Sequence, residues 1–171
     1  MTPLTVICQV GQTCTPERQE FVLLSDVLGV SALVDAISSK QAAEATESSV
    51  LGPFYSEASK MFENGQSITS NDVAGEPMLI RGAVFDTAGK PIQNALVDIW
   101  ETDGNGFYDL QAAEYNEPDC RGKFFTEPNG SFYLKGVKPV DYPIPNDGPV
   151  GQILSLLNRD CRRPAHVVRG L

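Results

Sequence analysis

The sequence has very little of what most protein metal clusters use: it contains a single histidine, His166, and four cysteines that never form a C-x-x-C pair. A structural zinc site needs four closely spaced cysteine or histidine ligands, so the sequence argues against one. Four cysteines in a chain of 171 residues also do not amount to a disulfide scaffold. We therefore expect Cys8, Cys14, Cys120 and Cys161 to be reduced and the protein to be cytoplasmic.

Basic residues and long apolar runs are also scarce. Lysine and arginine total 13 against 22 acidic residues, which gives a formal net charge of −9. Binding to nucleic-acid phosphates needs a basic patch, so this balance argues against a nucleic-acid partner. No apolar run approaches the ~20 residues of a membrane-spanning helix. The first cation is Arg18, so the N-terminus lacks the basic region of a signal peptide. We expect neither a membrane span nor a signal peptide.

The first fifty residues have the pattern of a small helical head. Thr15-Pro16-Glu17 is a typical helix start, with a hydroxyl cap, proline in the first turn and an acid near the positive helix end. Gly29 is expected to bend or split this helix. Residues 38–50 are small and polar, which is typical of a linker. Apolar side chains recur along the helix at steps of three and four residues: Phe21, Leu24, Leu28 and Ala32.

After residue 77 the pattern changes to short segments separated by turns that contain glycine and proline. We expect a short helix over residues 152–158 and four strands: 78–85, 95–100, 131–137 and 164–168. The sequence therefore predicts a mainly β protein, a partial β-sandwich catalytic domain preceded by a small α-helical head. The expected division lies between a helical dimerisation and linker segment, 1–50, and a sandwich domain, 51–171.

Six unlike motifs occur in one order along the chain. They are RQEFVLLSDVLG at 18–29, TESSVLGPFY at 46–55, the strand pair GxVxD…GxPI…AxVDxW at 82–100, DxxGFY at 103–108, PVDYPIP at 139–145 and RPAH at 163–166. Together they resemble the intradiol ring-cleavage dioxygenases of the hydroxyquinol and catechol 1,2-dioxygenase branch. Any one alone is weak, since the strand pair also fits non-catalytic transthyretin-like sandwiches.

The resemblance implies a ferric iron cofactor, Fe(3+), held by tyrosines and histidines. By position, the metal ligands in this chain are Tyr108, Tyr142 and His166. Ferric iron is a hard acid, so anionic phenolate oxygen suits it, and imidazole adds a neutral donor. Metal binding also selects the deprotonated phenol.

The resemblance further implies a catecholic substrate, O2 as co-substrate and a cis,cis-muconate-type product. The two catalytic side chains are Tyr142, which takes up a substrate proton, and Arg163, whose guanidinium stabilises charge that develops on the ring. The family's helical head also implies a homodimer. Arg163 is among the substrate-lining positions, and the others are Leu23, Asp26, Val50, Leu51, Gly52, Pro53, Phe54, Ile144 and Pro145.

Val168 is the main departure from the family pattern, because it stands where a second histidine ligand is expected, two residues after His166. The chain also ends three residues later, so we expect it to be truncated at its C-terminus, and its opening suggests the same for the N-terminus. Three alternatives stay open: a non-catalytic β-sandwich binding or assembly module, an inactive fragment, and a head whose apolar stripe packs on its own sandwich instead of forming a dimer.

Overall fold

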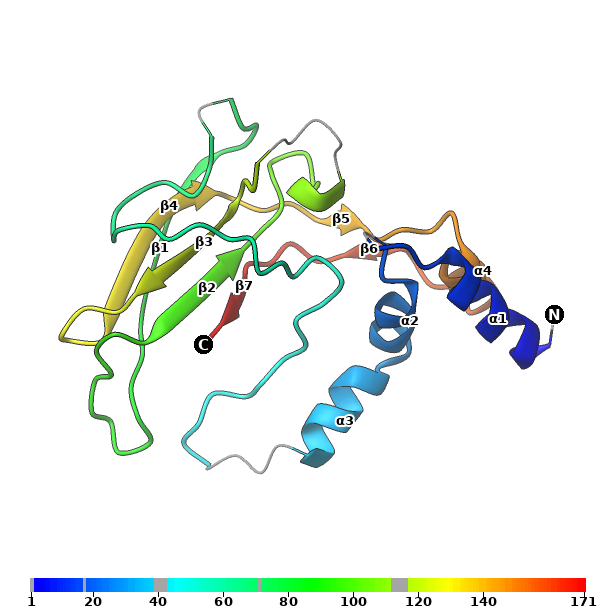
Figure 1. Ribbon diagram of the computed structural model, residues 1–171, viewed down its shortest axis with the longest axis horizontal. Helices are drawn as coiled ribbons and strands as arrows, with labels where there is room; N and C mark the ends of the chain where they lie inside the picture. The colour runs from blue at the N-terminus through cyan, green and yellow to red at the C-terminus, as the bar shows by residue number, and fades with distance from the viewer. Residues whose placement is uncertain (1, 17, 39–42, 71, 112–116) are drawn as a thin grey trace. The chain divides into compact units, whose positions relative to one another are not determined.

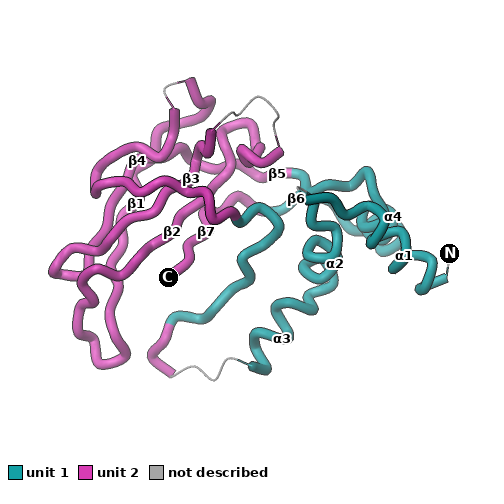
Figure 2. Tube along the Cα trace, in the orientation of Figure 1, with its two compact units in different colours: residues 1–41, 46–55, 143–163 teal, residues 42–45, 56–142, 164–171 magenta. Residues whose placement is uncertain are grey.

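The computed structural model describes residues 2–16, 18–38, 43–70, 72–111 and 117–171 (Figure 1). Glu17 of the predicted helix start therefore lies outside the described residues. The chain forms two compact units (Figure 2). Unit 1 contains residues 1–41, 46–55 and 143–163, and unit 2 contains residues 42–45, 56–142 and 164–171. These units do not follow the division expected at residue 50, because residues 143–163 return to the helices.

Unit 1 contains the four α-helices of the described residues: α1 (Pro3–Thr13), α2 (Glu20–Leu28), α3 (Val30–Ser38) and α4 (Pro149–Leu156). Sequence patterning does not predict α1, although its start has ordinary capping chemistry. Thr2 is the N-cap, its hydroxyl accepts a hydrogen bond from the Thr5 N–H at 3.3 Å, and Pro3 occupies the first turn.

The predicted break at Gly29 is confirmed. Gly29 has a φ of +73°, a left-handed conformation that glycine adopts without steric cost, and it separates α2 from α3. The predicted helix start is wrong, because α2 begins at Glu20. The Thr15 hydroxyl instead accepts a hydrogen bond from the Arg18 N–H at 3.0 Å in the preceding turn.

The described residues contain no single helix that is long and apolar enough to cross a membrane. By length and composition, α2 and α3 meet that test only when taken together, and they are bent by 72° at Gly29.

A charged network joins α2 to the start of α4 inside unit 1. Glu20 is fully buried, and its carboxylate accepts hydrogen bonds from Arg18 Nε at 2.8 Å and from the Val150 N–H at 3.3 Å. Arg18 also donates to Asp147 at 2.9 Å, and this bond holds the pKa of Asp147 below its usual value. The network satisfies a buried carboxylate and one free N–H at the N-terminus of α4.

Unit 2 is built on two antiparallel sheets. In the first, β1 (Pro77–Ala83) pairs with β4 (Ser131–Val137). In the second, the strand order is β3 (Arg121–Phe125), β2 (Leu96–Trp100) and β7 (Val168–Gly170). The register places Pro77 opposite Val137 in the first sheet, and Leu96 opposite Phe125 and Trp100 opposite Val168 in the second.

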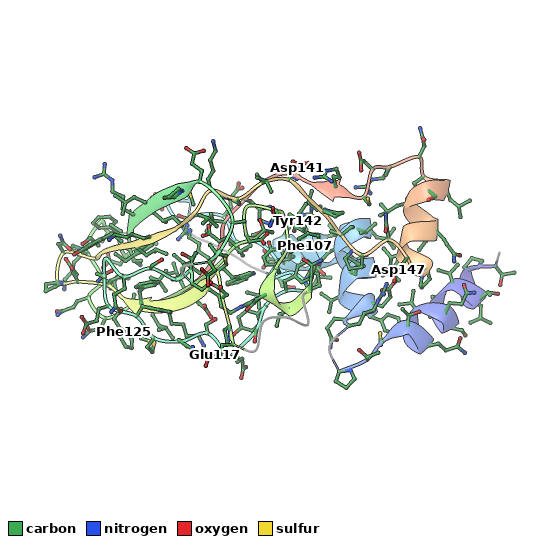
Figure 3. All side chains as sticks on the ribbon, turned by 90° about the horizontal axis from the view of Figure 1, so that it is seen from above. Phe107, Glu117, Phe125, Asp141, Tyr142 and Asp147 are labelled. Carbon is green, nitrogen blue, oxygen red and sulfur yellow. The ribbon has the colours of Figure 1, made fainter. Side chains whose placement is uncertain are left out.

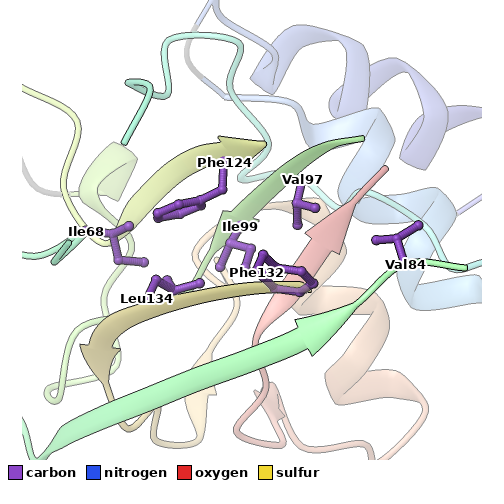
Figure 4. Packing of buried hydrophobic residues seen from close by; sticks show 7 residues of the cluster. All are labelled: Ile68, Val84, Val97, Ile99, Phe124, Phe132 and Leu134. Carbon is purple, nitrogen blue, oxygen red and sulfur yellow. The ribbon is translucent and has the colours of Figure 1, made fainter. Parts of the chain in front are cut away.

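One hydrophobic cluster joins the two sheets. Side chains alternate between inward and outward positions along β4, as the two-residue period of a strand requires. The buried members come from both sheets and their flanking turns (Figure 4): Ile68, Val84, Val97, Ile99, Phe124, Phe132 and Leu134. This shared core fixes the strand ends from which the loops of the candidate site emerge.

The expectation of a mainly β protein is too strong, because helices and strands take comparable shares of the chain. The extra helical content comes from α1 and from a longer α4, which begins at Pro149 instead of residue 152. The strand predicted over 164–168 is also wrong. The chain there forms two short strands, β6 (Arg162–Arg163), which pairs with β5 (Tyr142–Pro143), and β7. Pro164 between them lacks the N–H that a continuous strand would need.

Candidate functional site

The loop after β2 holds Tyr108 in the interior of unit 2. The Asp103 carboxylate accepts hydrogen bonds from the N–H groups of Asn105 and Phe107, both at 2.9 Å. Gly106 has a φ of +87°, which the tight turn requires. Tyr108 is 1% exposed, and its N–H donates to the Gln111 side chain at 2.9 Å. The loop therefore fixes the backbone on both sides of the phenol.

A buried ion pair fixes the residue that follows Tyr108. Asp109 begins a single turn of 3-10 helix (Asp109–Gln111), and its carboxylate accepts a hydrogen bond from Arg121 Nε at 2.7 Å and a second from Arg121 Nη2. The Asp119 N–H donates to the same carboxylate at 3.2 Å. Both side chains of the pair are buried. This two-pronged contact has the planar geometry that favours arginine over lysine.

Three aromatic rings meet in unit 2. The rings of Tyr108 and Tyr142 lie edge to face, with centroids 5.2 Å apart and an interplanar angle of 89°. The ring of His166 lies 5.5 Å from that of Tyr142. Tyr142 is buried in β5 and is labelled in Figure 3, and His166 lies in the segment between β6 and β7. The structure thus brings together the three side chains that the sequence singled out as metal ligands, and their role as ligands stays a prediction.

The His166 ring is oriented by its own backbone. Its Nδ1 lies 2.7 Å from the Pro164 carbonyl oxygen. A carbonyl oxygen only accepts, so this hydrogen bond requires the proton on Nδ1, and Nε2 is the ring nitrogen that a metal could use. Metal-binding histidines commonly make such a hydrogen bond through the nitrogen that does not bind the metal.

The chemistry of this donor set fits ferric iron. Two phenol oxygens and one imidazole nitrogen are the hard and intermediate donors that the ion accepts. Within the described parts of the chain, no cluster of three or more histidine, cysteine, aspartate or glutamate side chains could hold a metal. The three-ring cluster is the candidate metal centre on the chemistry of its own donor atoms. Val168, two residues after His166, brings no donor atom, because its side chain is a half-buried hydrocarbon in β7.

Unit 1 contains a pocket of about 380 Å³ between the end of α2 and the segment that follows α4. Three of the predicted substrate-lining residues contribute to it: Asp26, Ile144 and Arg163. The other lining residues are Val27, Leu28, Gly29, Leu154, Arg159, Asp160 and Arg162. The pocket combines apolar side chains with charged groups of both signs, and half of its lining residues are charged.

The remaining predicted substrate residues do not line this pocket. Leu23 is buried in α2, and Phe54 is buried in the segment before residue 56. Leu51 is exposed, whereas the other four are half-buried: Val50, Gly52, Pro53 and Pro145. Their assignment to substrate binding stays a prediction.

Sequence reasoning missed Arg159, Asp160 and Arg162 as pocket residues. Three arginines within five positions of an acidic chain were an available signal. The Asp109–Arg121 pair was not predictable, because its members are twelve residues apart and neither belongs to a recognisable motif.

Two further buried groups lie near the end of β2. Glu101 is 1% exposed, and its Oε1 accepts a hydrogen bond from the Val137 N–H at 3.0 Å. Burial raises the pKa of this carboxyl to about 7, and its Oε2 has no hydrogen-bond partner among the described residues. Burial and neighbouring acids, Asp119 first among them, raise the pKa of the Cys120 thiol, so it is protonated and unreactive at neutral pH.

Two family models match this chain and show the family to which it belongs. Residues 50–169 match the family model described as "Dioxygenase", and residues 2–46 match the model described as "Catechol dioxygenase N terminus". The chain belongs to the intradiol ring-cleavage dioxygenases. The family resemblance drawn from the six motifs is thereby confirmed.

Relatives of this intradiol dioxygenase chain include the intradiol ring-cleavage dioxygenase hqdA of Aspergillus niger, 46% identical over 98% of this chain and 50% of the relative. The hydroxyquinol 1,2-dioxygenase of a Rhizobium species is 43% identical over 98% of this chain and 57% of the relative. Among solved structures, the hydroxyquinol 1,2-dioxygenase of Pseudomonas putida DLL-E4 matches with a TM-score of 0.87 and 41% identity, over 97% of this chain and 58% of that one. The chain spans about half the length of the curated relatives it matches.

Proposed function

We propose that this chain takes part in the intradiol cleavage of hydroxyquinol or catechol by O2 at a ferric centre. The observation that carries the proposal is the cluster of Tyr108, Tyr142 and His166 rings, which brings a suitable donor set together in a family member. Relatives named hydroxyquinol 1,2-dioxygenase favour hydroxyquinol within the branch.

Tyr108, Tyr142 and His166 are the residues that would hold iron. Ferric iron, when bound, supplies Lewis acidity and a template for the two oxygens of a catecholate. The roles of the two tyrosines differ. Tyr142 Oη takes up a proton from the substrate hydroxyl, whereas Tyr108 stays in place because its loop is fixed by Asp103 and by the Asp109–Arg121 pair. His166 presents Nε2, because Nδ1 is committed to the Pro164 carbonyl.

Arg163 and Asp26 are assigned to the substrate itself. The Arg163 guanidinium is a permanent cation in the pocket and stabilises negative charge that develops on a catecholate. The Asp26 carboxylate in the same pocket can accept a hydrogen bond from a ring hydroxyl. Ile144 supplies an apolar surface for the ring.

The test is oxygen uptake by the iron-loaded chain with hydroxyquinol and with catechol, followed together with the absorbance of the ring-opened product. We expect uptake matched by product, abolished in Tyr142→Phe. We also expect turnover to fall about 100-fold in Arg163→Met, but by less than about 3-fold in Arg81→Met, which removes an exposed cation from β1 outside the pocket. Absence of uptake by the loaded chain with either substrate would contradict the proposal.

Val168 favours a second candidate function, in which the chain binds iron or a catecholic ligand but does not turn it over. With valine at the expected position of the second histidine, the cluster has three protein donors. Ferric iron and catechol binding without oxygen uptake would support this alternative.

A cytoplasmic location and a homodimer through the helical head belong to the main proposal, and gel filtration of the purified chain tests the dimer.

A further inference from the structure

Arg159 links the two walls of the pocket in unit 1. Its Nη1 donates a hydrogen bond to the Val27 carbonyl oxygen at 3.0 Å, in the last turn of α2. The last turn of a helix leaves carbonyl groups without partners and carries partial negative charge, so a guanidinium is favourable there. α2 has no basic residue of its own in that turn. Arg159 supplies the missing cation from a segment 132 residues further along the chain.

The backbone of Arg159 is itself fixed by the end of α4. Asn158 adopts a left-handed conformation with a φ of +51°, and its N–H donates to the Ser155 carbonyl at 3.1 Å. The Arg159 N–H donates to the Leu154 carbonyl at 2.9 Å. These two bonds are the pairing of a Schellman motif, in which asparagine can replace the usual glycine. The motif holds the origin of the Arg159 side chain in one place relative to α4.

We call the hydrogen bond from Arg159 to the Val27 carbonyl the tether, and it joins the two charged walls of the pocket. On the α2 side it holds Val27, whose neighbour Asp26 lines the pocket. On the other side, Arg159 lies four residues before Arg163 in the same pocket. Gly29, directly after α2, adopts a left-handed conformation that ends the helix. The last turn of α2 therefore does not continue into further helical backbone.

We propose that Arg159 is a positioning residue that sets the place of Asp26 relative to Arg163 and so sets the affinity of the pocket for a hydroxylated aromatic ring. This inference rests on the proposed function for the identity of the ligand. It goes beyond that function by assigning a role to a residue that would not touch the reacting atoms.

The test compares Arg159→Met and Arg159→Lys with the matched control Arg81→Met, which removes an exposed cation from β1 in unit 2. Binding of hydroxyquinol and of catechol to each chain of 171 residues is measured by anaerobic calorimetry. We expect Arg159→Met to weaken hydroxyquinol binding about 10-fold, Arg159→Lys to recover most of the loss, and Arg81→Met to leave it unchanged.

A double-mutant cycle separates positioning from a general structural effect. If Arg159 acts through Asp26, Arg159→Met should cost less than about 2-fold in the Asp26→Asn background. Equal losses in both backgrounds, or an unchanged affinity in Arg159→Met, would overturn the proposal.

Amide hydrogen exchange supplies a readout that does not depend on any ligand. We expect Arg159→Met to speed exchange in the last turn of α2 about 10-fold while the strands of unit 2 are unaffected. Unchanged exchange in that turn would overturn the tether. A wild-type chain that binds neither aromatic ligand would contradict the proposed function, and the exchange result would still decide whether Arg159 holds α2.

Discussion

The two units of the molecule use arginine in opposite settings. In unit 2, Arg121 and its partner Asp109 are both buried, directly after Tyr108. In unit 1, Arg18 joins the buried Glu20 to Asp147, whose side chain is 73% exposed. Losing one member of a buried pair leaves an uncompensated charge, whereas a pair that reaches solvent is replaced by water. The difference indicates that the buried Asp109–Arg121 pair tolerates less change than the exposed Arg18–Asp147 contact.

The largest effect is expected from Arg121→Met. It leaves the Asp109 carboxylate buried without its cation, so we expect unfolding free energy to fall by about 3–5 kcal/mol in urea denaturation. Adding Asp109→Leu to that variant should recover part of the loss, because the orphaned charge is removed. A loss below about 1 kcal/mol would contradict the difference drawn between the two units.

Glu101→Gln tests a buried carboxyl in unit 2 that has no cationic partner among its hydrogen bonds. Its pKa is raised to about 7 in the folded protein from 4.5, so folding favours the protonated form. The wild-type chain therefore bears no penalty below pH 4.5, loses stability as the pH rises from there to about 7, and bears the full penalty above. We expect Glu101→Gln to be more stable than wild type by up to about 3 kcal/mol at pH 8, and equal to it at pH 4.

The control for that measurement is Glu63→Gln, which changes an exposed carboxyl in the same unit. Urea denaturation at several pH values compares the three proteins. A stability difference between Glu101→Gln and wild type that does not change with pH would show that Glu101 is not protonated on folding.

Val168→His tests whether β7 can supply the second imidazole donor that is present in the family pattern. Because Val168 and His166 are two residues apart, the new imidazole would share the side of the chain that His166 occupies in an extended segment. We expect ferric affinity to rise at least about 10-fold in competition with citrate. Arg169→His is the matched control, since it adds a histidine at the exposed neighbouring position. Equal gains in the two variants would contradict the assignment of position 168.

The smallest effect is expected from Asp147→Asn in unit 1. The variant removes an exposed partner of Arg18, while Glu20 keeps its hydrogen bonds to Arg18 and Val150. Unfolding free energy should therefore fall by about 0.5 kcal/mol in urea denaturation. A loss above about 2 kcal/mol would mean that the two units do not differ in the way described.

Three of the expected strands could be anticipated from local signals and the three rings from the family resemblance, whereas the supporting contacts could not be predicted. The strand over 131–137 was predicted with its observed bounds because alternation and the preceding Pro128-Asn129-Gly130 turn agree. Gly29 marked the helix break by its conformational freedom. The strand β3 lacks strong alternation, since two of its five residues are Arg121 and Gly122, and the buried Arg121 pairs with Asp109, which lies outside the strand.

The candidate site shows the same division. The three rings were found through motifs, and the motifs carry no information about how the rings are held. Arg159 and Asp109 act through contacts with residues distant in sequence, which no periodicity reveals. Val168 could be recognised from the sequence, because the family pattern has a histidine at this position. Its effect on ferric affinity is what the Val168→His variant measures.

The most direct test of the central claim, that Tyr108, Tyr142 and His166 form one metal centre, is a ferric titration of the purified chain followed by visible absorption. We predict a saturable phenolate-to-iron charge-transfer band that is weakened in Tyr108→Phe and in Tyr142→Phe and absent when both are replaced, with Tyr133→Phe as the control from β4. A protein that stays colourless, or a band that survives the double replacement, would contradict the claim.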